Sequence, residues 1–319
     1  MTGFQPVIGL DLGGTKIDAA LVGADGTILA RHRVPTPAGE GSAAVLDAMA
    51  STVSAVLGQG GNANATAIGV AAAGVINPVT GMVTSATDTI RGWAGTALAA
   101  GLAARTGLPV ACDNDVRAAA ATELTRAEGA DASLLYLAVG TGVGGAVAVA
   151  GRVLTGAAGI AGHLGHLPSP EAAGLPCTCG ATGHLEGIAA GPGIAAQYAR
   201  VTGTVPGPLQ RVAARAELGD AHAMAAITLG AQAAGRVLGG LANAFGPHRV
   251  VVAGGVPRIG ALYWNALRDA FSAELMSPLR ELRLTPTAPR VGHDAAVLGA
   301  ATLTRTLPLH TPSTTGVSR

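Results

Sequence analysis

Near the start of the chain, the residues best suited to chemistry lie in the sequence VIGLDLGGTKI, from Val7 to Ile17. Apolar positions lead to Asp11, and the turn that follows consists of Gly13, Gly14, Thr15 and Lys16. This order predicts a strand, a tight turn and a second strand. Backbone N–H groups next to glycine, a hydroxyl and an ammonium group suit a phosphate, and Asp11 could hold Mg²⁺ beside it. The alternative is an ordinary glycine hairpin, although Lys16 is the only lysine of the chain.

A second glycine turn follows an apolar strand predicted at 133–139. Its sequence, GTGVGG, contains Gly140, Thr141, Gly142, Gly144 and Gly145, and another strand is predicted at 146–150. Strand, glycine turn and strand thus recur about 125 residues after the first example, which we expect if two similar lobes bind one nucleotide. The alternative is a flexible turn. Gly254 and Gly255 end a further predicted strand, 249–253, and are candidates for contact with an adenosine group.

A third group of polar residues follows the strand predicted at 109–112. It consists of Asp113, Asn114 and Asp115, and a helix is predicted at 116–126. Ligands of α/β sheets gather at the carboxyl ends of strands. Phosphoryl transfer to an alcohol requires a carboxylate that accepts the hydroxyl proton, and Asp115 suits this role. The alternative is that Asn114 or Asp115 only caps the helix.

A fourth group is rich in histidine and cysteine, and it lies in an irregular, glycine-containing stretch between residues 156 and 191. The candidate metal ligands are His166, Cys177, Cys179 and His184. Two thiolates and two imidazoles form a ligand set that tetrahedral zinc accepts. The alternative is a pair of free cysteines beside solvent-exposed histidines. His163 and Glu186 flank the group and could hydrogen-bond a ligand.

The elements that must position these residues alternate in type. In the first part of the chain, strands are predicted at 17–22, 27–34, 67–72 and 109–112, and helices at 43–57 and 94–105. Gly74 follows the strand at 67–72. In the second part, helices are predicted at 188–201, 220–245, 262–275 and 294–303, and a short strand at 282–285. This order places the chain in the α/β class.

Composition narrows the choice of function. The chain has 319 residues, a net charge of +1, 49% hydrophobic and 12% charged residues, so nucleic acid and charged membrane surfaces are not expected partners. Glycine interrupts the apolar runs before they reach about 18 residues, and the N-terminus lacks the pattern of a signal peptide. These features predict a cytoplasmic protein. In a reducing compartment, the C-x-C pair is a metal site rather than a disulfide, while Cys112 is predicted to be a buried strand residue.

Several motifs taken together resemble the ROK family of bacterial sugar kinases. They occur in one order over nearly the whole chain: DLGGTK, CDND, GTGVGG, GHLGH, CTCGATGHLE and GHDAAVLGA. The resemblance implies the two-lobed actin/hexokinase-like ATPase fold with ribonuclease H-like lobes. It also implies a homodimer and ATP, Mg²⁺ and structural Zn²⁺ as cofactors. The implied domains are a small lobe at 1–114, to which a helix at 292–305 returns, and a large lobe at 115–291 with the zinc loop. A disordered tail is expected at 306–319.

The family pattern also implies individual roles. The two glycine turns would bind ATP phosphates, Asp115 would be the catalytic base, and Asn114, with Gly74 nearby, would hold the sugar. Glu186 would contact the sugar near its anomeric end, and His166 would be a zinc ligand that also touches the sugar.

Two positions depart from the usual pattern. His163 occupies a position where the family commonly has glutamate, and AGHLGH is similar to the corresponding motif of bacterial N-acetylmannosamine kinases. His184 occupies the position of a common cysteine ligand, and its longer side chain would change the geometry of the metal site. The resemblance therefore implies ATP-dependent phosphorylation of the 6-hydroxyl of an amino sugar, with N-acetylmannosamine favoured and glucose or N-acetylglucosamine as alternatives. A catalytically silent sugar-binding regulator is the alternative from another class. The family's repressors carry a helix-turn-helix before the first lobe, and only ten residues precede Asp11 here.

Overall fold

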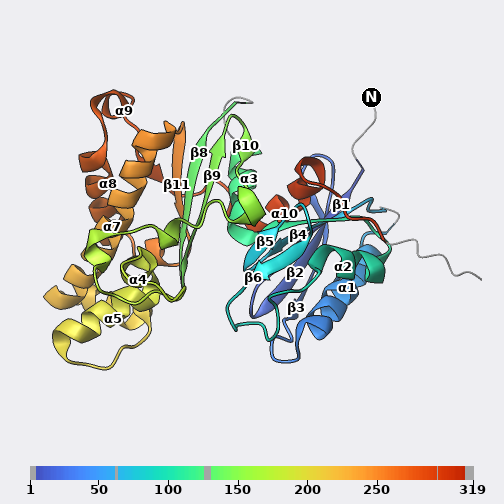
Figure 1. Cartoon of the computed structure of the whole chain (residues 1–319), viewed down its shortest axis with the longest axis horizontal. Helices are drawn as coiled ribbons and strands as arrows, with labels where there is room; N and C mark the ends of the chain where they lie inside the picture. The colour runs from blue at the N-terminus through green and yellow to red at the C-terminus, as the bar shows by residue number, and fades with distance from the viewer. Residues whose placement is uncertain (1–4, 62–63, 126–130, 293, 313–319) are drawn as a thin grey trace, which may run out of the picture. The chain divides into compact units, whose positions relative to one another are not determined.

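The structure is a computed structural model that describes residues 5–61, 64–125, 131–292 and 294–312. Contacts within the chain divide it into two compact units. Unit 1 comprises residues 1–126, 155–161 and 291–319, and unit 2 comprises residues 127–154 and 162–290. Figure 1 shows the elements of both units along the chain.

The sheet of unit 1 has five strands in the order β3-β2-β1-β4-β7. The strands are β1 (Val7–Leu12), β2 (Lys16–Val22), β3 (Ile28–Pro35), β4 (Ile68–Ala72) and β7 (Val110–Asn114). Strands β1, β2 and β3 form the predicted antiparallel meander, and β1, β4 and β7 run parallel. Leu12, Ala72 and Asn114 are aligned across the parallel strands. The segments that follow these three residues therefore leave the sheet at one edge.

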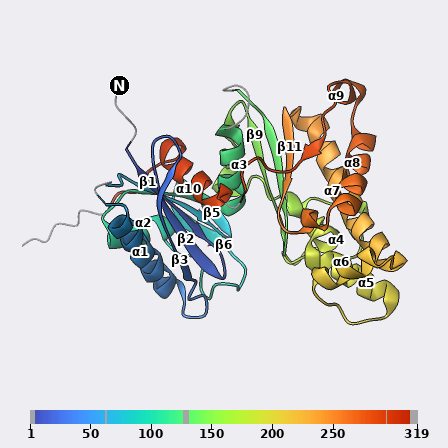
Figure 2. The ribbon, with the colours of Figure 1, turned by 180° about the vertical axis from the view of Figure 1, so that it is seen from behind.

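Helices cover both faces of this sheet (Figures 1 and 2). Helices α1 (Ser42–Gln59) and α2 (Leu98–Thr106) contribute to one core, which also contains the β1 side chains of Ile8, Leu10 and Leu12. The other face packs against α10 (Ala295–Thr306), which lies beside α3 (Asp115–Thr125). A two-stranded hairpin, β5 (Val75–Asn77) and β6 (Met82–Ser85), completes the unit. Cys112 is buried in β7, as predicted.

Glycine allows α10 to lie directly on the sheet. A Cβ atom at Gly9 would overlap the backbone oxygen of Val297, and one at Gly69 would overlap that of Ala300. Gly299 makes an equally close approach to Ala118 of α3. Because α3 packs on α10 in this way, residues 115–125 belong with unit 1, whereas the sequence placed the boundary at residue 114.

Unit 2 repeats the architecture. Its sheet has the order β10-β9-β8-β11-β12, formed by β8 (Leu134–Val139), β9 (Val143–Val149), β10 (Arg152–Val153), β11 (Arg249–Ala253) and β12 (Pro286–Thr287). Strands β10, β9 and β8 pair antiparallel, and β8, β11 and β12 pair parallel. The predicted repetition of strand, glycine turn and strand is therefore confirmed, and it extends to the whole sheet.

The helices of unit 2 pack around one long central helix. They are α4 (Glu186–Ala189), α5 (Gly191–Thr202), α6 (Leu209–Glu217), α7 (Ala221–Phe245), α8 (Ala261–Glu274) and α9 (Ser277–Glu281). Helix α7 contacts α4, α5, α6 and α8, and its buried residues form the largest core of this unit with β8 and β11. Asp220 caps α7 by accepting hydrogen bonds from the backbone N–H groups of His222 and Ala223.

Three predicted elements differ from the structure. The helix predicted at 188–201 is divided at Ala190, which has an extended backbone, because Gly191 and Pro192 begin a new helix. The strand predicted at 282–285 was wrong, since Arg283 has a positive φ of 54° and the strand beside β11 is β12. Within the predicted tail, His310 pairs with Val110 of β7, and residues 313–319 lie outside the described residues. Among the described residues, no helix is long and apolar enough to cross a membrane.

Candidate active site

The first glycine turn, residues 13–16, joins β1 to β2 as predicted. The N–H of Gly13 donates to the carbonyl of Lys16 at 3.0 Å. Thr36, which follows β3, braces the turn, because its hydroxyl donates to the Gly13 carbonyl at 2.8 Å and its N–H donates to Thr15 at 3.1 Å. Thr36 therefore fixes the conformation of the turn. The Lys16 side chain is 46% exposed.

Asp11 lies at the end of β1, directly opposite Asp18 of β2. Burial raises the pKa of Asp11 to about 6, and the nearby carboxylates of Asp115 and Asp18 act in the same direction. Lys16 and Arg33 oppose this shift. A carboxylate that is difficult to ionise in the empty protein would gain from a cation, which fits the predicted role of Asp11 in holding Mg²⁺.

A cluster of charged residues beside this turn was not predicted. Asp18 is 1% exposed and accepts hydrogen bonds from Arg31 (2.8 and 2.9 Å) and Arg33 (2.6 and 3.1 Å). Burial opposes ionisation of Asp18, but the two guanidinium groups outweigh it and hold its pKa below the ordinary range. Arg31 also contacts Asp294 at the start of α10, at 2.6 Å. In the sequence, the signal for this cluster was the alternation Arg-His-Arg in β3, which places two arginines on the face of the sheet that carries Asp18.

Asn114 connects the end of β7 to α3 and to the loop after β4. Its side-chain oxygen accepts hydrogen bonds from the N–H groups of Val116 (3.0 Å) and Arg117 (3.3 Å), so Asn114 caps α3, as the alternative prediction for this residue stated. Its amide nitrogen donates to the Gly74 carbonyl at 3.0 Å and to Asp115 at 2.9 Å. Gly74 has a φ of 105°, and a Cβ there would come within 2.8 Å of the Ser85 carbonyl. The structure therefore brings Gly74, Asn114 and Asp115 together.

Asp115 is partly buried at the first position of α3. Its Oδ1 atom accepts hydrogen bonds from Asn114 and from the N–H of Val116 at 2.9 Å. Among the hydrogen bonds between described residues, none reaches Oδ2. Burial raises the pKa of Asp115 above its ordinary value. A carboxylate of this kind is better matched to proton transfer near neutral pH.

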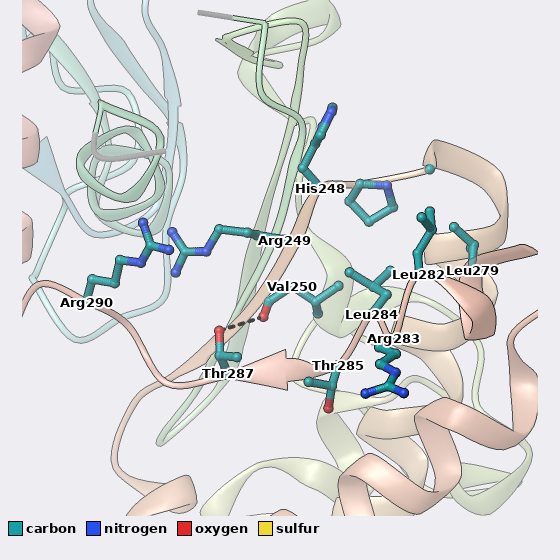
Figure 3. A pocket seen from close by; sticks show the side chains of 12 residues that line it. His248, Arg249, Val250, Leu279, Leu282, Arg283, Leu284, Thr285, Thr287 and Arg290 are labelled. Atoms are coloured by element: carbon teal, nitrogen blue, oxygen red, sulfur yellow. Dashed lines mark hydrogen bonds between the residues drawn. The ribbon is translucent and has the colours of Figure 1, made fainter. Parts of the chain in front are cut away.

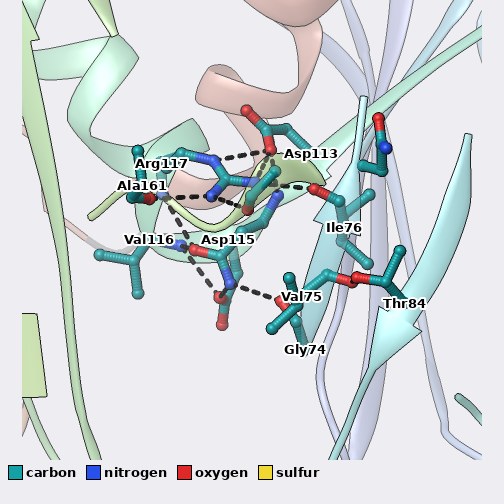
Figure 4. A network of polar contacts seen from close by, with 12 residues as sticks. Gly74, Val75, Ile76, Thr84, Asp113, Asp115, Val116, Arg117 and Ala161 are labelled. Atoms are coloured by element: carbon teal, nitrogen blue, oxygen red, sulfur yellow. Dashed lines mark hydrogen bonds and ion pairs between the residues drawn. The ribbon is translucent and has the colours of Figure 1, made fainter. Parts of the chain in front are cut away.

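Arg117 holds the start of α3 in place through a buried network of polar contacts, which was not predicted from the sequence (Figure 4). It is 1% exposed and forms an ion pair with Asp113, to which its Nε donates at 2.8 Å. Its other donors reach the carbonyls of Ile76 (2.9 Å), Gly159 (2.7 Å) and Ala161 (3.1 Å). The spacing of Asp113 and Arg117, four residues apart across a helix start, was the only local signal.

In unit 2, the second glycine turn joins β8 to β9 as predicted, and the N–H of Gly140 donates to Gly142 at 2.9 Å. The segment 162–166 lies directly on β9, because a Cβ at Gly145 would overlap Leu164 and one at Gly165 would overlap the Val143 carbonyl. This packing places His163 and His166 beside the turn. The two imidazole rings stack with centroids 6.3 Å apart.

Glu186 at the start of α4 contacts the same turn. Its Oε2 accepts a hydrogen bond from the N–H of Val143 at 2.8 Å, and its Oε1 accepts one from the Thr178 hydroxyl. A Cβ at Gly142 would lie only 2.7 Å from Oε2, so glycine is required for this approach. The second glycine turn, Glu186 and the loop that carries the candidate metal ligands thus meet in unit 2. We use "metal loop" for residues 166–184.

The candidate metal ligands converge. The ligand atoms of His166, Cys177, Cys179 and His184 all lie within 4.8 Å of one another. Cys177 Sγ lies 3.4 Å from His166 Nδ1, and Cys179 Sγ lies 3.2 Å from His184 Nδ1. Tetrahedral zinc with these ligands would place neighbouring donor atoms about 3.3–3.8 Å apart. The two measured distances lie close to this spacing, so the four residues form a candidate zinc site in which histidine is the fourth ligand.

The predicted adenosine contact lies at the carboxyl end of β11. Gly254 has a φ of 101°, and a Cβ there would overlap the backbone oxygen of Val139 at the end of β8. Gly255 has open space at its Cβ position. The carboxyl ends of β8 and β11 are therefore adjacent, beside the start of the second glycine turn. Gly254 and Gly255 expose only backbone atoms there.

A separate pocket of about 600 Å³ lies at the opposite end of β11 (Figure 3). Its lining includes His248 and Arg249 from the start of β11 and Thr287 of β12, whose hydroxyl donates to Val250 at 3.3 Å. None of the predicted site residues lines it. The pocket is therefore distinct from the groups described above.

Comparison with known proteins agrees with this organisation. The chain is 36% identical over 298 residues to N-acetylmannosamine kinase of Escherichia coli strain 55989, covering 93% of this chain and 97% of that protein. The ROK hexokinase from Thermus thermophilus superposes with a TM-score of 0.83 and 33% identity, covering 94% of this chain and 97% of that one. A ROK family glucokinase from Streptomyces griseus, solved with glucose and AMPPNP, has a TM-score of 0.76 and 29% identity, over 94% and 99%.

These likenesses establish the two-lobed, actin-like ATPase fold that the sequence predicted. The ROK family model matches residues 7–306, which is nearly the whole chain. The chain belongs to the ROK family.

Proposed function

We propose that this protein is an ATP-dependent sugar kinase that phosphorylates the 6-hydroxyl of an amino sugar, with N-acetylmannosamine as the favoured acceptor. The observation that carries the proposal is the group formed by Asn114, Asp115 and Gly74, at the sheet edge where the first glycine turn also leaves. The relatives named above are kinases or hexokinases, which supports the same class of reaction.

In the proposed reaction, the two glycine turns bind the phosphates of ATP through backbone N–H groups, and Lys16 adds a positive charge. Asp11 would hold Mg²⁺, which neutralises charge on the transferring phosphoryl group when it is bound. The sugar hydroxyl oxygen attacks the γ-phosphorus, its proton passes to Oδ2 of Asp115, and ADP leaves. The raised pKa of Asp115 supports this role, because a base with a pKa closer to the working pH transfers protons more effectively.

Several further assignments belong to the same proposal. Asn114 and Glu186 bind sugar hydroxyls, and Gly254 and Gly255 border the adenosine group. The metal loop holds one structural zinc, which closes the loop and takes no part in the transfer. A cytoplasmic location and a homodimer are predictions carried over from the sequence.

The choice of acceptor rests on His163 and on the relatives. A carboxylate at that position could accept hydrogen bonds from two neighbouring equatorial hydroxyls, whereas a neutral imidazole offers one donor and one acceptor. Glucose and N-acetylglucosamine are the second candidates, since the Streptomyces griseus relative was solved with glucose. A silent sugar-binding regulator is the candidate from another class.

A coupled assay of ADP release with a panel of hexoses and N-acetylhexosamines tests the proposal. We expect turnover with N-acetylmannosamine, and we expect Asp115→Asn to keep nucleotide and sugar binding but to lose about 10²–10⁴-fold in turnover. Single-turnover transfer from labelled ATP separates a slow kinase from a silent binding protein. Retention of more than about a tenth of wild-type turnover by Asp115→Asn would remove Asp115 from the role of base.

A further inference from the structure

Thr178 occupies the position between the two cysteines of the metal loop. The N–H of Gly180 donates to the Cys177 carbonyl at 3.0 Å, and the N–H of Cys177 donates to Ala181 at 2.8 Å. Thr178 is therefore the second residue of a four-residue turn, and the two candidate metal ligands on either side of it are part of the same turn. The direction of its hydroxyl depends on how that turn is held.

Glu186 accepts a hydrogen bond from this hydroxyl and also contacts the second glycine turn. One carboxylate oxygen accepts from Thr178, and the other accepts from the N–H of Val143 in the second glycine turn, at 2.8 Å. Gly142 lies so close to the same carboxylate that a Cβ atom would not fit at this position. A single side chain thus joins the metal loop to the turn that we propose binds ATP phosphates, entirely within unit 2.

We infer that Thr178 is a positioning residue that couples metal binding in the loop to nucleotide binding at the second glycine turn, through Glu186. The inference rests on the proposed function, since it assigns the turn to ATP phosphates. Metal bound by Cys177 and Cys179 holds the residue between them, and Thr178 then keeps Glu186 on the N–H of Val143. Without that hydroxyl, the carboxylate can rotate away from the N–H of Val143, and the turn loses a contact that orders its backbone.

The test measures binding of AMPPNP with Mg²⁺ by isothermal titration calorimetry, in the absence of sugar, so that it does not depend on turnover. Thr178→Val removes the hydroxyl and keeps the side-chain shape, whereas Thr178→Ser keeps the hydroxyl. Thr182→Val is the matched control, because Thr182 is an exposed threonine of the same loop. Each protein is measured with zinc bound and after removal of zinc by a chelator, and zinc content is determined by elemental analysis.

We expect Thr178→Val to retain zinc and to bind AMPPNP about 3- to 10-fold more weakly, because the lost hydrogen bond acts on the nucleotide only indirectly, through Glu186. Thr178→Ser and Thr182→Val should stay within about twofold of the wild type. Chelation should weaken the wild type by a similar factor and add little to the effect of Thr178→Val, because both changes break the same connection. In steady-state assays, Thr178→Val should raise KM for ATP and leave the pH profile of kcat, which Asp115 sets, unchanged.

Two results would overturn the coupling: wild-type affinity in zinc-loaded Thr178→Val, or an equal loss on chelation in Thr178→Val and in the wild type. Failure of the wild type to bind AMPPNP at all is a different result. It would remove the proposed function, and this inference with it.

Discussion

Asp11→Asn should stabilise unit 1 at alkaline pH. Burial raises the pKa of Asp11 from the ordinary value of 3.8 to about 6. A shift of about two units corresponds to about 3 kcal/mol between the charged and neutral forms. Since the Asp11 side chain retains partial contact with solvent, we expect a measured effect of about 2 kcal/mol.

The sign follows from the direction of the shift. The folded-state pKa lies above the unfolded-state pKa, so the stability associated with neutral Asp11 is fully present below about pH 4 and is lost as the pH rises through about 6. Asparagine carries no charge at any of these values. The variant should therefore exceed the wild type by about 2 kcal/mol in free energy of unfolding at pH 8, and the difference should approach zero near pH 4.

Urea unfolding followed by tryptophan fluorescence measures this difference. The chain has two tryptophans, of which Trp93 is buried in the core of unit 1 and Trp264 lies in α8 of unit 2. In a Trp264→Phe background, the signal reports unit 1 alone, so separate unfolding of the two units does not distort the result. Asp88→Asn, at an exposed position of unit 1, is the control for loss of one negative charge.

A difference between Asp11→Asn and the wild type that does not change with pH would refute the electrostatic reasoning. Destabilisation by asparagine at pH 8 would do the same. If Asp11 also holds Mg²⁺ as proposed, the stabilised variant should have reduced turnover, which would show that this carboxylate is retained for function at the expense of stability.

Two further predictions concern unit 2. We expect one zinc per chain by elemental analysis of protein purified without added zinc or chelator, and we expect Cys177→Ser to lose the metal and to raise KM for the sugar, because a closed four-ligand site folds its own loop. Full activity with much less than one zinc per chain would mean that His184 does not complete the site. His163→Glu should move the ratio of kcat/KM from N-acetylmannosamine towards glucose, by up to about 10–200-fold if shape alone discriminates. A wild type that prefers glucose, or an unchanged ratio in the variant, would remove His163 from the choice of sugar and leave the kinase assignment in place.

Local sequence was sufficient for several parts of the site. Both glycine turns lie where the patterns predicted them, because apolar runs on either side of consecutive or alternating glycines are a local signal for two strands joined by a turn. Asn114 caps α3, which was the alternative predicted for this residue, since its side-chain oxygen accepts hydrogen bonds from backbone groups two and three residues ahead. The four candidate metal ligands were chosen from residue type and spacing, and their ligand atoms lie within 4.8 Å of one another. In each of these cases, the interacting groups are close in the chain or are of residue types that commonly bind metal.

Other features depended on packing between distant segments. Arg31 meets Asp294 across 263 positions, and Arg117 reaches the Gly159 carbonyl across 42, so neither partner could be chosen from the local pattern. The division of the chain after α3 was likewise set by the contact of α3 with α10 rather than by the turn at Asn114.

The sequence by itself determined the turns and the helix cap and indicated the candidate ligand set, because short-range sterics and hydrogen bonding limit what those residues can do. Only the tertiary structure decided that Glu186 lies against Gly142 and Val143, that Thr178 reaches the same carboxylate, and that burial moves the pKa of Asp11. These properties arise from the surroundings that a side chain meets after folding. Removal from water and the approach of groups far away in the chain are not encoded in any short stretch of residues.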